Sequence, residues 1–375
     1  MSQNIHLLSI SHSFLKKINT DVYSLLSKKF NLNVTLVSPT FHFEGKKKIK
    51  PDFKENEIDI KIITKKTFFN HLRFKIYRNL ISEIKKNKIT HLLLDFDIMS
   101  LQSIILIVYS FLYDYKIFYY SNENNIIKEK HIIKKIIKIF FYRLFSLLIA
   151  KKLINIFCYT KQIKENLDYC GFKEKTKIVP LGFNNKIFYR LPSNFNENIF
   201  IISYFGRISK KKGLHTLVKA LNKLNLDKWI FYLDIFEIDN ISYYKSIKQD
   251  LKNLNKNKKL KIIKASHNDI HNYMKKTKLT IVPSEWNEQY GRIIQEAAAC
   301  GSIVVGSNVG SIPEMLIDKE FIFKDGNVNE LKEKIEDIYY NYKFYRKKFD
   351  LIENNIISNR TTFNQAKIIF DSIYK

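Results

Sequence analysis

The sequence predicts an α/β protein built from two doubly wound, parallel-sheet units. Short apolar runs alternate with longer segments of helical periodicity, which is typical of parallel strands joined by right-handed crossover helices. This alternation stops near residues 183–197, where turn residues mix without periodicity, and then restarts. With 375 residues, the chain is long enough for two such units, each with a buried core.

The first half of the chain contains a series of short apolar runs bounded by polar or turn residues, which predict strands. These runs are residues 4–10, 33–39, 91–97, 116–120, 155–160 and 177–183. Helical periodicity marks residues 21–30 and 161–170, and Gly171 follows the second helix where a C-terminal cap is expected.

The second half repeats this pattern, so we expect a second doubly wound unit. Its predicted strands are residues 199–207, 229–236, 259–265, 278–284 and 302–308. Helices are predicted over 212–224, from Tyr290-Gly291 to Cys300-Gly301, and from Pro313 onward. Two units of this kind leave a cleft at the carboxyl ends of their sheets, where ligands normally bind.

The net charge is +28 and the pI is near 9.7, which favours a polyanionic partner: nucleic acid, an anionic membrane or a phosphorylated substrate. The alternative is compositional drift, since Lys, Asn and Ile are abundant throughout. Residues 1–190 carry 34 basic and 15 acidic side chains, whereas the remainder carries 30 and 21. The first half is therefore the expected side of an anionic surface.

The three cysteines, at positions 158, 170 and 300, are too far apart for a disulfide framework or a CxxC metal site. They suit a reducing compartment such as the cytoplasm. The first ten residues predict a buried strand and not a signal peptide, because no basic segment precedes the apolar run. The uncharged stretch from Ser100 to Tyr113 is short for a membrane-spanning helix.

Residues 131–154 are basic and apolar at helical spacing. Such a helix could lie on an anionic membrane surface. The alternative is a half-buried core helix with solvated lysines, and from the sequence we favour this second interpretation.

The segment from Ile281 to Leu316 carries the most informative chemistry. Glu288 precedes a predicted helix and Glu296 lies eight residues further, about 12 Å along the helix axis. The amides of Tyr290, Gly291 and Arg292 open that helix, and a helix N-terminus beside a glycine is suited to phosphate oxygens. The two acids could then hold hydroxyls on either side of a diphosphate.

Two cations are predicted to face the same cleft. Arg207 follows a strand and Lys212 precedes Gly213 at the start of a helix. Fixed positive charge at this position would stabilise a leaving diphosphate. Lys210 and Lys211 are expected to be solvated surface residues, and Arg292 either reaches the diphosphate or points to solvent.

These motifs resemble the retaining glycosyltransferases of family 4, which have the GT-B fold. The matching text is GRxxxxKG, then PSxxxExxGxxxxEAxAxG, then GxxPE, carried by Gly206, Arg207, Lys212, Gly213, Pro283, Ser284, Glu288, Gly291, Glu296, Ala297, Ala299, Gly301, Gly310, Pro313 and Glu314. The segments 179–188 and 363–374 are also similar to the family. The resemblance covers most of residues 150–375, and residues 1–150 only by their pattern.

The resemblance implies an acceptor domain over 1–185, a nucleotide-sugar donor domain over 186–360, and a helix over 361–375 that returns to the first domain. It assigns the donor sugar hydroxyls to Glu288, the nucleotide ribose to Glu296 and the diphosphate to Arg207 and Lys212. The loop with Gly206 and the amides at 290–292 complete the donor site. The family generally needs no divalent metal, so we expect neither a metal nor another cofactor.

The sequence departs from the family in three places. The turn after the first strand has no glycine, and His12 or Ser13 stands there instead. The strand that usually supplies a histidine is followed by Ser121, Asn122, Glu123 and Asn124, so Asn122 and Glu123 become candidates for the acceptor side, with a helix cap as the alternative for Glu123. Residues 237–239 replace a glycine-containing loop near the nucleotide, which leaves the base undefined.

Asp95-Phe96-Asp97 is a DxD sequence, which binds a metal in another glycosyltransferase fold. A DxD alone is a weak signal, because an acid at a strand end is common.

We therefore expect a cytoplasmic, metal-independent hexosyltransferase that uses a nucleotide-diphosphate sugar. The expected acceptor is a growing cell-surface glycan, such as a lipopolysaccharide, or a lipid-linked saccharide. The basic first domain would associate peripherally with the anionic inner membrane face, and no nucleic-acid partner is expected. The alternative is a non-catalytic basic module that binds nucleic acid or membrane.

Overall fold

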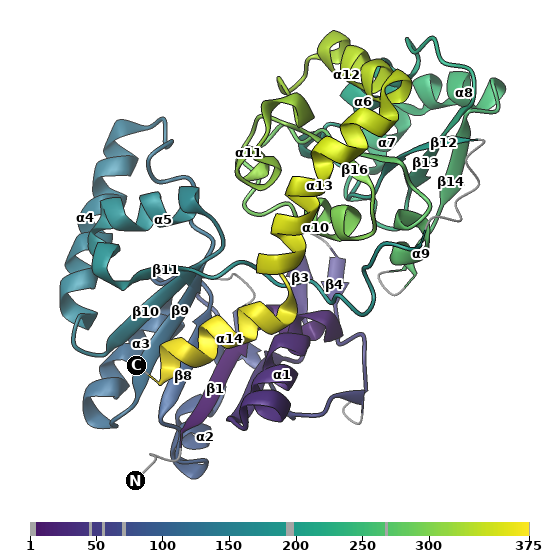
Figure 1. Ribbon diagram of the computed structural model, residues 1–375. Coiled ribbons are helices and arrows are strands. Elements are labelled where there is room, and N and C mark those ends of the chain that lie inside the picture. Colours follow the sequence, from purple (N-terminus) through teal and green to yellow (C-terminus); the bar gives the residue numbers. More distant parts are fainter. Residues whose placement is uncertain are drawn as a thin grey trace. The chain divides into compact units, whose positions relative to one another are not determined.

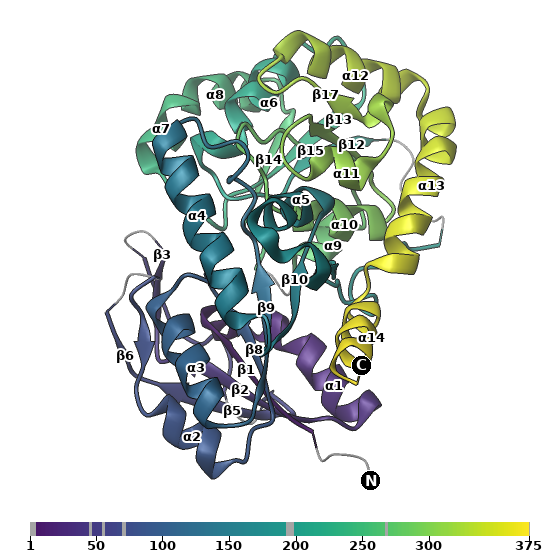
Figure 2. The same cartoon turned by 90° about the vertical axis from the view of Figure 1, so that its left-hand side faces the viewer.

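The computed structural model describes residues 5–44, 47–54, 57–69, 73–192, 199–266 and 269–374. The chain divides into two units: unit 1 is Met1–Gly182 with Thr362–Lys375, and unit 2 is Phe183–Thr361. Each unit contains a parallel sheet covered by helices (Figures 1 and 2). The predicted boundary region, 183–197, begins where unit 2 begins, and its residues 193–197 lie outside the described residues.

Unit 1 has a parallel sheet of seven strands in the order β11-β10-β9-β8-β1-β2-β5. The strands are β1 (His6–Ser11), β2 (Asn33–Pro39), β5 (Lys61–Lys65), β8 (His91–Asp95), β9 (Lys116–Ser121), β10 (Leu153–Cys158) and β11 (Thr176–Ile178). Two short antiparallel pairs lie outside this sheet: β3 (His42–Glu44) with β4 (Lys47–Ile49), and β6 (Thr67–Phe68) with β7 (Ile76–Tyr77).

The helices of unit 1 cover both faces of the sheet, so its central strands are buried on both sides. One core contains side chains of α2 (Leu80–Lys86), α3 (Leu101–Leu112), α4 (Ile132–Ile149) and α5 (Lys161–Leu167). The other contains side chains of α1 (Asp21–Phe30) and α14 (Thr362–Ile373). Helix α14 lies beside α1 in both views, although about 330 residues separate them in the sequence (Figures 1 and 2).

Unit 2 has a parallel sheet of six strands in the order β14-β13-β12-β15-β16-β17. The strands are β12 (Phe200–Tyr204), β13 (Trp229–Asp234), β14 (Leu260–Ile263), β15 (Leu279–Val282), β16 (Ile303–Ser307) and β17 (Ile322–Phe323). Its helices are α6 (Leu214–Leu221), α7 (Ile241–Ser246), α8 (Lys248–Lys256), α9 (Ile270–Met274), α10 (Arg292–Ala299), α11 (Ile312–Leu316), α12 (Val328–Tyr340) and α13 (Tyr342–Asn359). The prediction of two doubly wound α/β units is confirmed.

Short helical turns connect several of these elements. They are η1 (His12–Leu15), η2 (Lys17–Thr20), η4 (Asp168–Phe172), η5 (Lys173–Lys175), η6 (Lys210–Lys212) and η7 (Lys319–Phe321). The helix predicted over 161–170 ends at Leu167 and continues as the wider turn η4, in which Gly171 has a φ of 92°. The left-handed conformation at Gly171 agrees with its predicted role in ending the helix.

Helix α4 differs from the interpretation favoured by its sequence. Its lysines are not all solvated: Lys135 and Lys138 are only partly exposed, and most of its large apolar side chains are exposed. Tyr142, Phe145 and Ile149 are its buried residues. Within the described ranges, no helix combines the length and the apolar character needed to cross a membrane.

Candidate functional site

The strand order of unit 2 reverses between β12 and β15. From β12 the chain builds the sheet toward β13 and β14, and from β15 it builds in the opposite direction toward β16 and β17. The crevice at the carboxyl ends of such a strand pair is the usual ligand site of a doubly wound sheet. Arg207 and Lys212 follow β12, and Glu288 follows β15, so the topology brings these predicted residues to one place.

Lys212 and Glu288 form an ion pair at this reversal. Lys212 Nζ lies 2.5 Å from Glu288 Oε2. The same carboxylate oxygen accepts hydrogen bonds from Ser284 Oγ at 3.1 Å and Trp286 Nε1 at 3.0 Å. Glu288 is 7% exposed. Three donors from two loops therefore hold one buried carboxylate in a single orientation, as a preorganised polar site requires.

Two glycines allow the loops around this pair to approach each other. A Cβ at Gly213 would lie 1.8 Å from the Pro283 carbonyl oxygen, and a Cβ at Gly310 would lie 2.2 Å from the Glu288 carbonyl oxygen. Both glycines also have a positive φ. Any side chain at either position would separate the loops that carry Lys212 and Glu288.

The N-terminus of α10 lies directly after Glu288. Gly291 is its N-cap, with φ 69° and ψ 52°, and no capping side chain bonds to the first turn. Tyr290 is buried and donates its hydroxyl to Gln295 Oε1 at 2.8 Å. Residues 290–292 were predicted to bind phosphate through their amides, and Tyr290 can contribute only its backbone. The amides in the first turn of a helix without a capping side chain are suited to bind an anion.

Glu296 is buried within α10, 1% exposed. Arg292 Nε lies 3.6 Å from Glu296 Oε1, an atom that has no hydrogen-bond partner within the described residues. Burial raises the pKa of Glu296 to about 7, and the nearby Arg292 lowers it only in part. The Arg292 side chain therefore lies against its own helix. The sequence had predicted either that it reaches the diphosphate or that it points to solvent.

Arg207 is more exposed than Lys212 and pairs with Asp239, whose Oδ2 lies 3.7 Å from Arg207 Nη1. The neighbouring backbone is joined to the loop after β13, because Ile208 N donates to the Glu237 carbonyl at 2.8 Å and Asp239 N donates to the Ile208 carbonyl at 3.2 Å. The unusual segment 237–239 thus contacts the loop of Gly206 and Arg207 directly. A Cβ at Gly206 would lie 3.0 Å from the Tyr204 hydroxyl.

Sequence reasoning assigned no role to Glu285, which braces the loop of Glu288 against α6. Glu285 Oε1 accepts a hydrogen bond from Thr216 Oγ1 at 2.5 Å and lies 3.3 Å from His215 Nε2. Its backbone N donates to the Lys211 carbonyl at 2.8 Å. Trp286 was likewise unassigned. No spacing signal marks Glu285, because its partners lie about 70 positions earlier in the sequence.

The strand order of unit 1 reverses between β1 and β8, where Ser11 and Asp95 are register partners. Asp95 Oδ2 accepts hydrogen bonds from Ser11 Oγ at 2.7 Å and from the predicted acceptor-side residue Ser13 at 3.3 Å. Burial raises the pKa of Asp95, and the two serine hydroxyls lower it. Ser13 is therefore occupied in closing the turn after β1.

His12 lines a small pocket beside this reversal, together with Lys75, Tyr77, Phe96, Ser100 and Gln102. The His12 and His42 rings are 4.6 Å apart. Lys75 is 4% exposed, and its one hydrogen bond within the described residues joins Nζ to His42 Nδ1 at 3.0 Å. Burial lowers the pKa of Lys75. Neither Lys75 nor His42 had been predicted, since a single Lys in a lysine-rich chain carries no signal.

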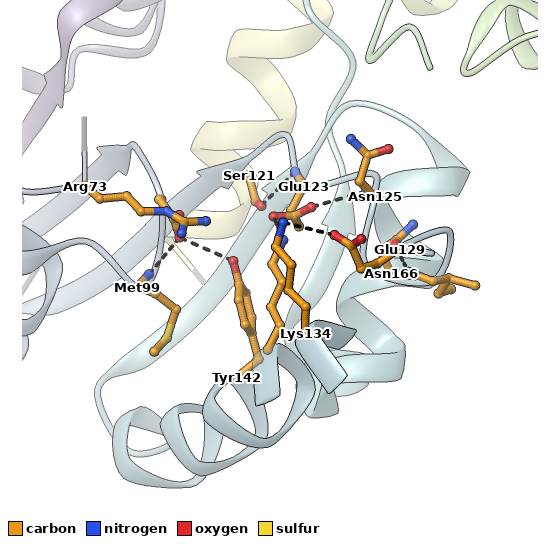
Figure 3. A network of polar contacts seen from close by, with 12 residues as sticks. Arg73, Met99, Ser121, Glu123, Asn125, Glu129, Lys134, Tyr142 and Asn166 are labelled. Atoms are coloured by element: carbon orange, nitrogen blue, oxygen red, sulfur yellow. Dashed lines mark hydrogen bonds and ion pairs between the residues drawn. The ribbon is translucent and has the colours of Figure 1, made fainter. Parts of the chain in front are cut away.

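The remaining acceptor-side candidates follow β9. The Glu123 carboxylate binds Lys138 Nζ of α4 at 2.6 Å and accepts a bond from Asn125 N at 3.2 Å, and Glu123 N donates to Ser121 Oγ at 3.4 Å (Figure 3). Asn122 is exposed. The structure thus ties Glu123 to its own loop and to α4, whereas Asn122 remains accessible.

The two acids of the DxD sequence have different partners. Asp97 binds Arg73 Nε at 3.0 Å and accepts bonds from Met99 N and the Tyr142 hydroxyl (Figure 3). Asp95 faces the serines after β1. Within the part of the chain that the structure describes, no three His, Cys, Asp or Glu side chains converge as a metal site.

Comparison with known proteins locates the strongest similarity in unit 2. Residues 185–355 match the family model of glycosyl transferases group 1. An uncharacterized glycosyltransferase of Methanocaldococcus jannaschii is 26% identical over 189 residues, covering 50% of each chain. The capsular polysaccharide biosynthesis glycosyltransferase CapM of Staphylococcus aureus is 26% identical over 220 residues, covering 52% of this chain and 56% of its own. The chain thus spans about half the length of these curated relatives.

Solved structures resemble the whole chain. A glycosyltransferase from Rickettsia africae aligns with a TM-score of 0.79 at 18% identity, covering 100% of this chain and 99% of its own. HepE from Anabaena, solved in complex with UDP, aligns with a TM-score of 0.75 at 16% identity, covering 99% and 100%. At these identities the likeness shows the fold, which is GT-B as predicted.

Proposed function

We propose that the protein is a retaining glycosyltransferase of family 4. It would move a hexosyl group from a nucleoside diphosphate sugar to a cell-surface glycan, such as a lipopolysaccharide, or to a lipid-linked saccharide. The observation that carries this proposal is the Lys212–Glu288 pair at the strand reversal of unit 2, directly before the N-terminus of α10. The match of unit 2 to glycosyl transferases group 1 supports it.

In this proposal, the bond between the anomeric carbon and the diphosphate oxygen breaks, and the electron pair leaves with the diphosphate. Lys212, Arg207 and the amides at the start of α10 stabilise the charge that develops there. Glu288 exchanges its bond to Lys212 for the hydroxyls of the donor sugar. An acceptor hydroxyl then bonds to the anomeric carbon, and its proton passes to the oxygen of the departing diphosphate.

Glu296 would hold the ribose of the nucleotide. Its Oε1 atom is buried without a hydrogen-bond donor among the described residues, and ribose hydroxyls would supply such donors. Hydrogen bonds to the charged carboxylate would also lower its raised pKa. We choose UDP as the first nucleotide to test, because HepE was solved with UDP and with UDP-glucose.

We further propose that transfer requires no metal ion. Two cationic side chains and a helix N-terminus can supply the positive charge that a metal would otherwise bring to the diphosphate. Activity with UDP-glucose that persists at full rate in excess EDTA supports this point, and its loss with recovery on adding Mg²⁺ contradicts it.

Unit 1 would bind the acceptor, with His12 and Ser13 beside the strand reversal and Asn122 at the end of β9. The three cysteines are free and buried, which suits a reducing cytoplasm. In this proposal unit 1 works at the inner face of an anionic membrane, where a lipid-linked acceptor would be presented.

Calorimetric titration with UDP, GDP and ADP in the absence of metal tests the donor site. We expect one of these nucleotides to bind at micromolar concentration. Arg207→Ala or Glu288→Gln should weaken this binding or abolish turnover of the corresponding nucleotide-glucose donor. Circular dichroism should show that both variants retain the fold. The alternative, a non-catalytic basic module, predicts that Glu288→Gln changes nothing and that binding to nucleic acid falls steeply with salt.

A further inference from the structure

Helix α4 presents an apolar face to its surroundings. Nine large apolar side chains of this helix are exposed: Ile132, Ile133, Ile136, Ile137, Phe140, Phe141, Leu144, Leu147 and Leu148. At 100° per residue they occupy about half of the helix circumference, along roughly 24 Å of its axis. A surface helix of a water-soluble protein normally has the opposite arrangement, with its apolar side turned toward the core.

The side of α4 that faces the rest of unit 1 buries Tyr142, Phe145 and Ile149 in the core, and it also carries two partly exposed lysines. Lys138 Nζ binds the Glu123 carboxylate at 2.6 Å, and Lys135 Nζ donates to the Ile127 carbonyl at 2.8 Å. These contacts and the buried Tyr142, Phe145 and Ile149 together fix the rotation of the helix, because turning the exposed face inward would break all of them. The exposed apolar face is therefore specified by both polar and apolar contacts on the other side.

Helix α3 extends this apolar surface. It packs in the same core as α4, on the same face of the sheet, and it contains no charged residue. Its exposed apolar side chains are Leu101, Ile104, Val108, Phe111 and Leu112. Exposed groups of large apolar side chains mark an interaction surface on a soluble protein. We name the exposed apolar side chains of both helices the α3/α4 face.

The charge around the α3/α4 face is predominantly positive, and the exposed acid after α3, Asp114, is paired with Lys152 at 3.0 Å. Residues 130–164 contain nine basic and no acidic side chains. Lys134, Arg143 and Lys151 are exposed at the start, middle and end of α4. The nearest preceding acid, Glu129, lies 3.5 Å from Lys134 and is neutralised by it. An apolar face bordered by cations is complementary to acyl chains beneath anionic headgroups.

We propose that the α3/α4 face docks on an anionic lipid bilayer, with α4 lying in the headgroup region. This assignment of a partner rests on the proposed function, in which the acceptor is presented at a membrane. A second copy of the chain is disfavoured because a two-fold interface would place the same cations of both copies against each other. Lipid phosphates, in contrast, neutralise those cations.

Vesicle flotation tests the proposal without donor or acceptor, so its outcome is independent of transferase activity. Vesicles contain phosphatidylcholine alone or with about 30% phosphatidylglycerol, an anionic lipid content that attracts basic segments. We expect the full chain to float with the anionic vesicles only, and 0.5 M salt, where the Debye length is roughly 4 Å, to reduce binding severalfold.

The test variant is the triple substitution Ile133→Glu, Phe140→Glu and Leu147→Glu. All three side chains are exposed, so the fold should be retained, and we expect binding to anionic vesicles to fall by about tenfold or more. The matched control is Leu351→Glu on α13, because Leu351 is 78% exposed and Leu147 is 76% exposed. It should bind as the unmodified chain does.

Two outcomes overturn the proposal. One is that the triple variant binds the vesicles as tightly as the unmodified chain. The other is that the unmodified chain does not bind vesicles but sediments as a dimer that the triple variant dissociates, which would make the α3/α4 face an interface between copies. Retained UDP binding in the triple variant shows that loss of vesicle binding reflects this face and not the donor site.

Discussion

The two units share a doubly wound topology, but the loops at their strand reversals differ in glycine content and in how the acidic side chain is bound. Seven of the ten glycines lie in unit 2, and Gly213, Gly291 and Gly310 surround the Lys212–Glu288 pair. The reversal of unit 1 has no glycine, and the carboxylate of Asp95 is satisfied there by two serine hydroxyls. The same fold thus brings backbone amides and a cation to one site and closes the other with side chains.

The difference in glycine content between the two strand reversals affects which kind of ligand each unit could bind. A loop with glycine lets backbone and helix N-terminus approach an anion, so unit 2 suits a diphosphate. Unit 1 keeps its reversal closed and places a buried lysine and two imidazoles beside it. In the proposed function, acceptor recognition by unit 1 would therefore depend on side chains, which vary more freely than a backbone geometry.

The largest effect is expected from removing the cationic side chain of Lys212 in unit 2. Lys212→Met should lower turnover of the preferred sugar nucleotide by about a thousandfold, because a preorganised charge at the leaving group is lost. Steady-state kinetics of nucleotide release measures this. Lys210→Met, two residues earlier and exposed, serves as the control and should retain full activity.

Gly213→Ala tests whether the close approach of the two loops around Lys212 and Glu288 requires a glycine. A methyl group at this position would lie 1.8 Å from the Pro283 carbonyl oxygen, so we expect unit 2 to lose about 3 kcal/mol more in free energy of unfolding than in Gly326→Ala. Gly326 has a similar positive φ but no atom within 4 Å of its Cβ position. Both tryptophans, Trp229 and Trp286, lie in unit 2, so their fluorescence in urea reports on this unit alone. Equal losses in the two variants would contradict the argument.

Donor binding should depend on the protonation of Glu296. Its pKa is about 7, so the carboxylate that accepts ribose hydroxyls forms as pH rises, and affinity for UDP should increase by about tenfold from pH 6 to pH 8. Glu296→Gln should remove this dependence. The phosphate of UDP titrates in both proteins, so the difference between them isolates Glu296. Parallel pH profiles would show that Glu296 does not bind the nucleotide.

The smallest effect concerns the buried lysine of unit 1. Burial lowers the pKa of Lys75, so its ammonium form costs stability at neutral pH, and Lys75→Met should raise the free energy of unfolding by about 1 kcal/mol. Because the unfolded chain keeps its proton up to about pH 10.5, the gain should shrink as pH approaches that value. Circular dichroism in urea measures both. A loss of several kcal/mol would instead make Lys75 a structural residue.

The sequence predicted the parts of the fold that depend on local pattern. The bounds of α1 and β2 match the predicted 21–30 and 33–39, because periodicity and turn residues define them locally. Several other elements were not predicted, among them α7, α8, α12 and α13, together with the short antiparallel pairs. The two-stranded pairs depend on contacts with neighbours that sequence spacing does not reveal.

At the candidate site, the motif residues were predicted but their partners were not. The spacing of Glu288 and Glu296 is a local feature, whereas the bond from Lys212 to Glu288 joins residues 76 positions apart. The orientation of α4 could not be predicted either. Its sequence shows apolar and basic residues, but the contact of Lys138 with Glu123 and the burial of Tyr142, Phe145 and Ile149 in the core determine which face turns outward.

The return of α14 to unit 1 has a consequence for biosynthesis. Ala366, Ile369 and Ile373 complete a core whose other members lie in the first 180 residues. Unit 2 lies between Phe183 and Thr361, so unit 1 cannot complete its core until the whole of unit 2 has been synthesised. Nascent chains stalled before residue 362 should therefore hold unit 1 in a protease-sensitive state.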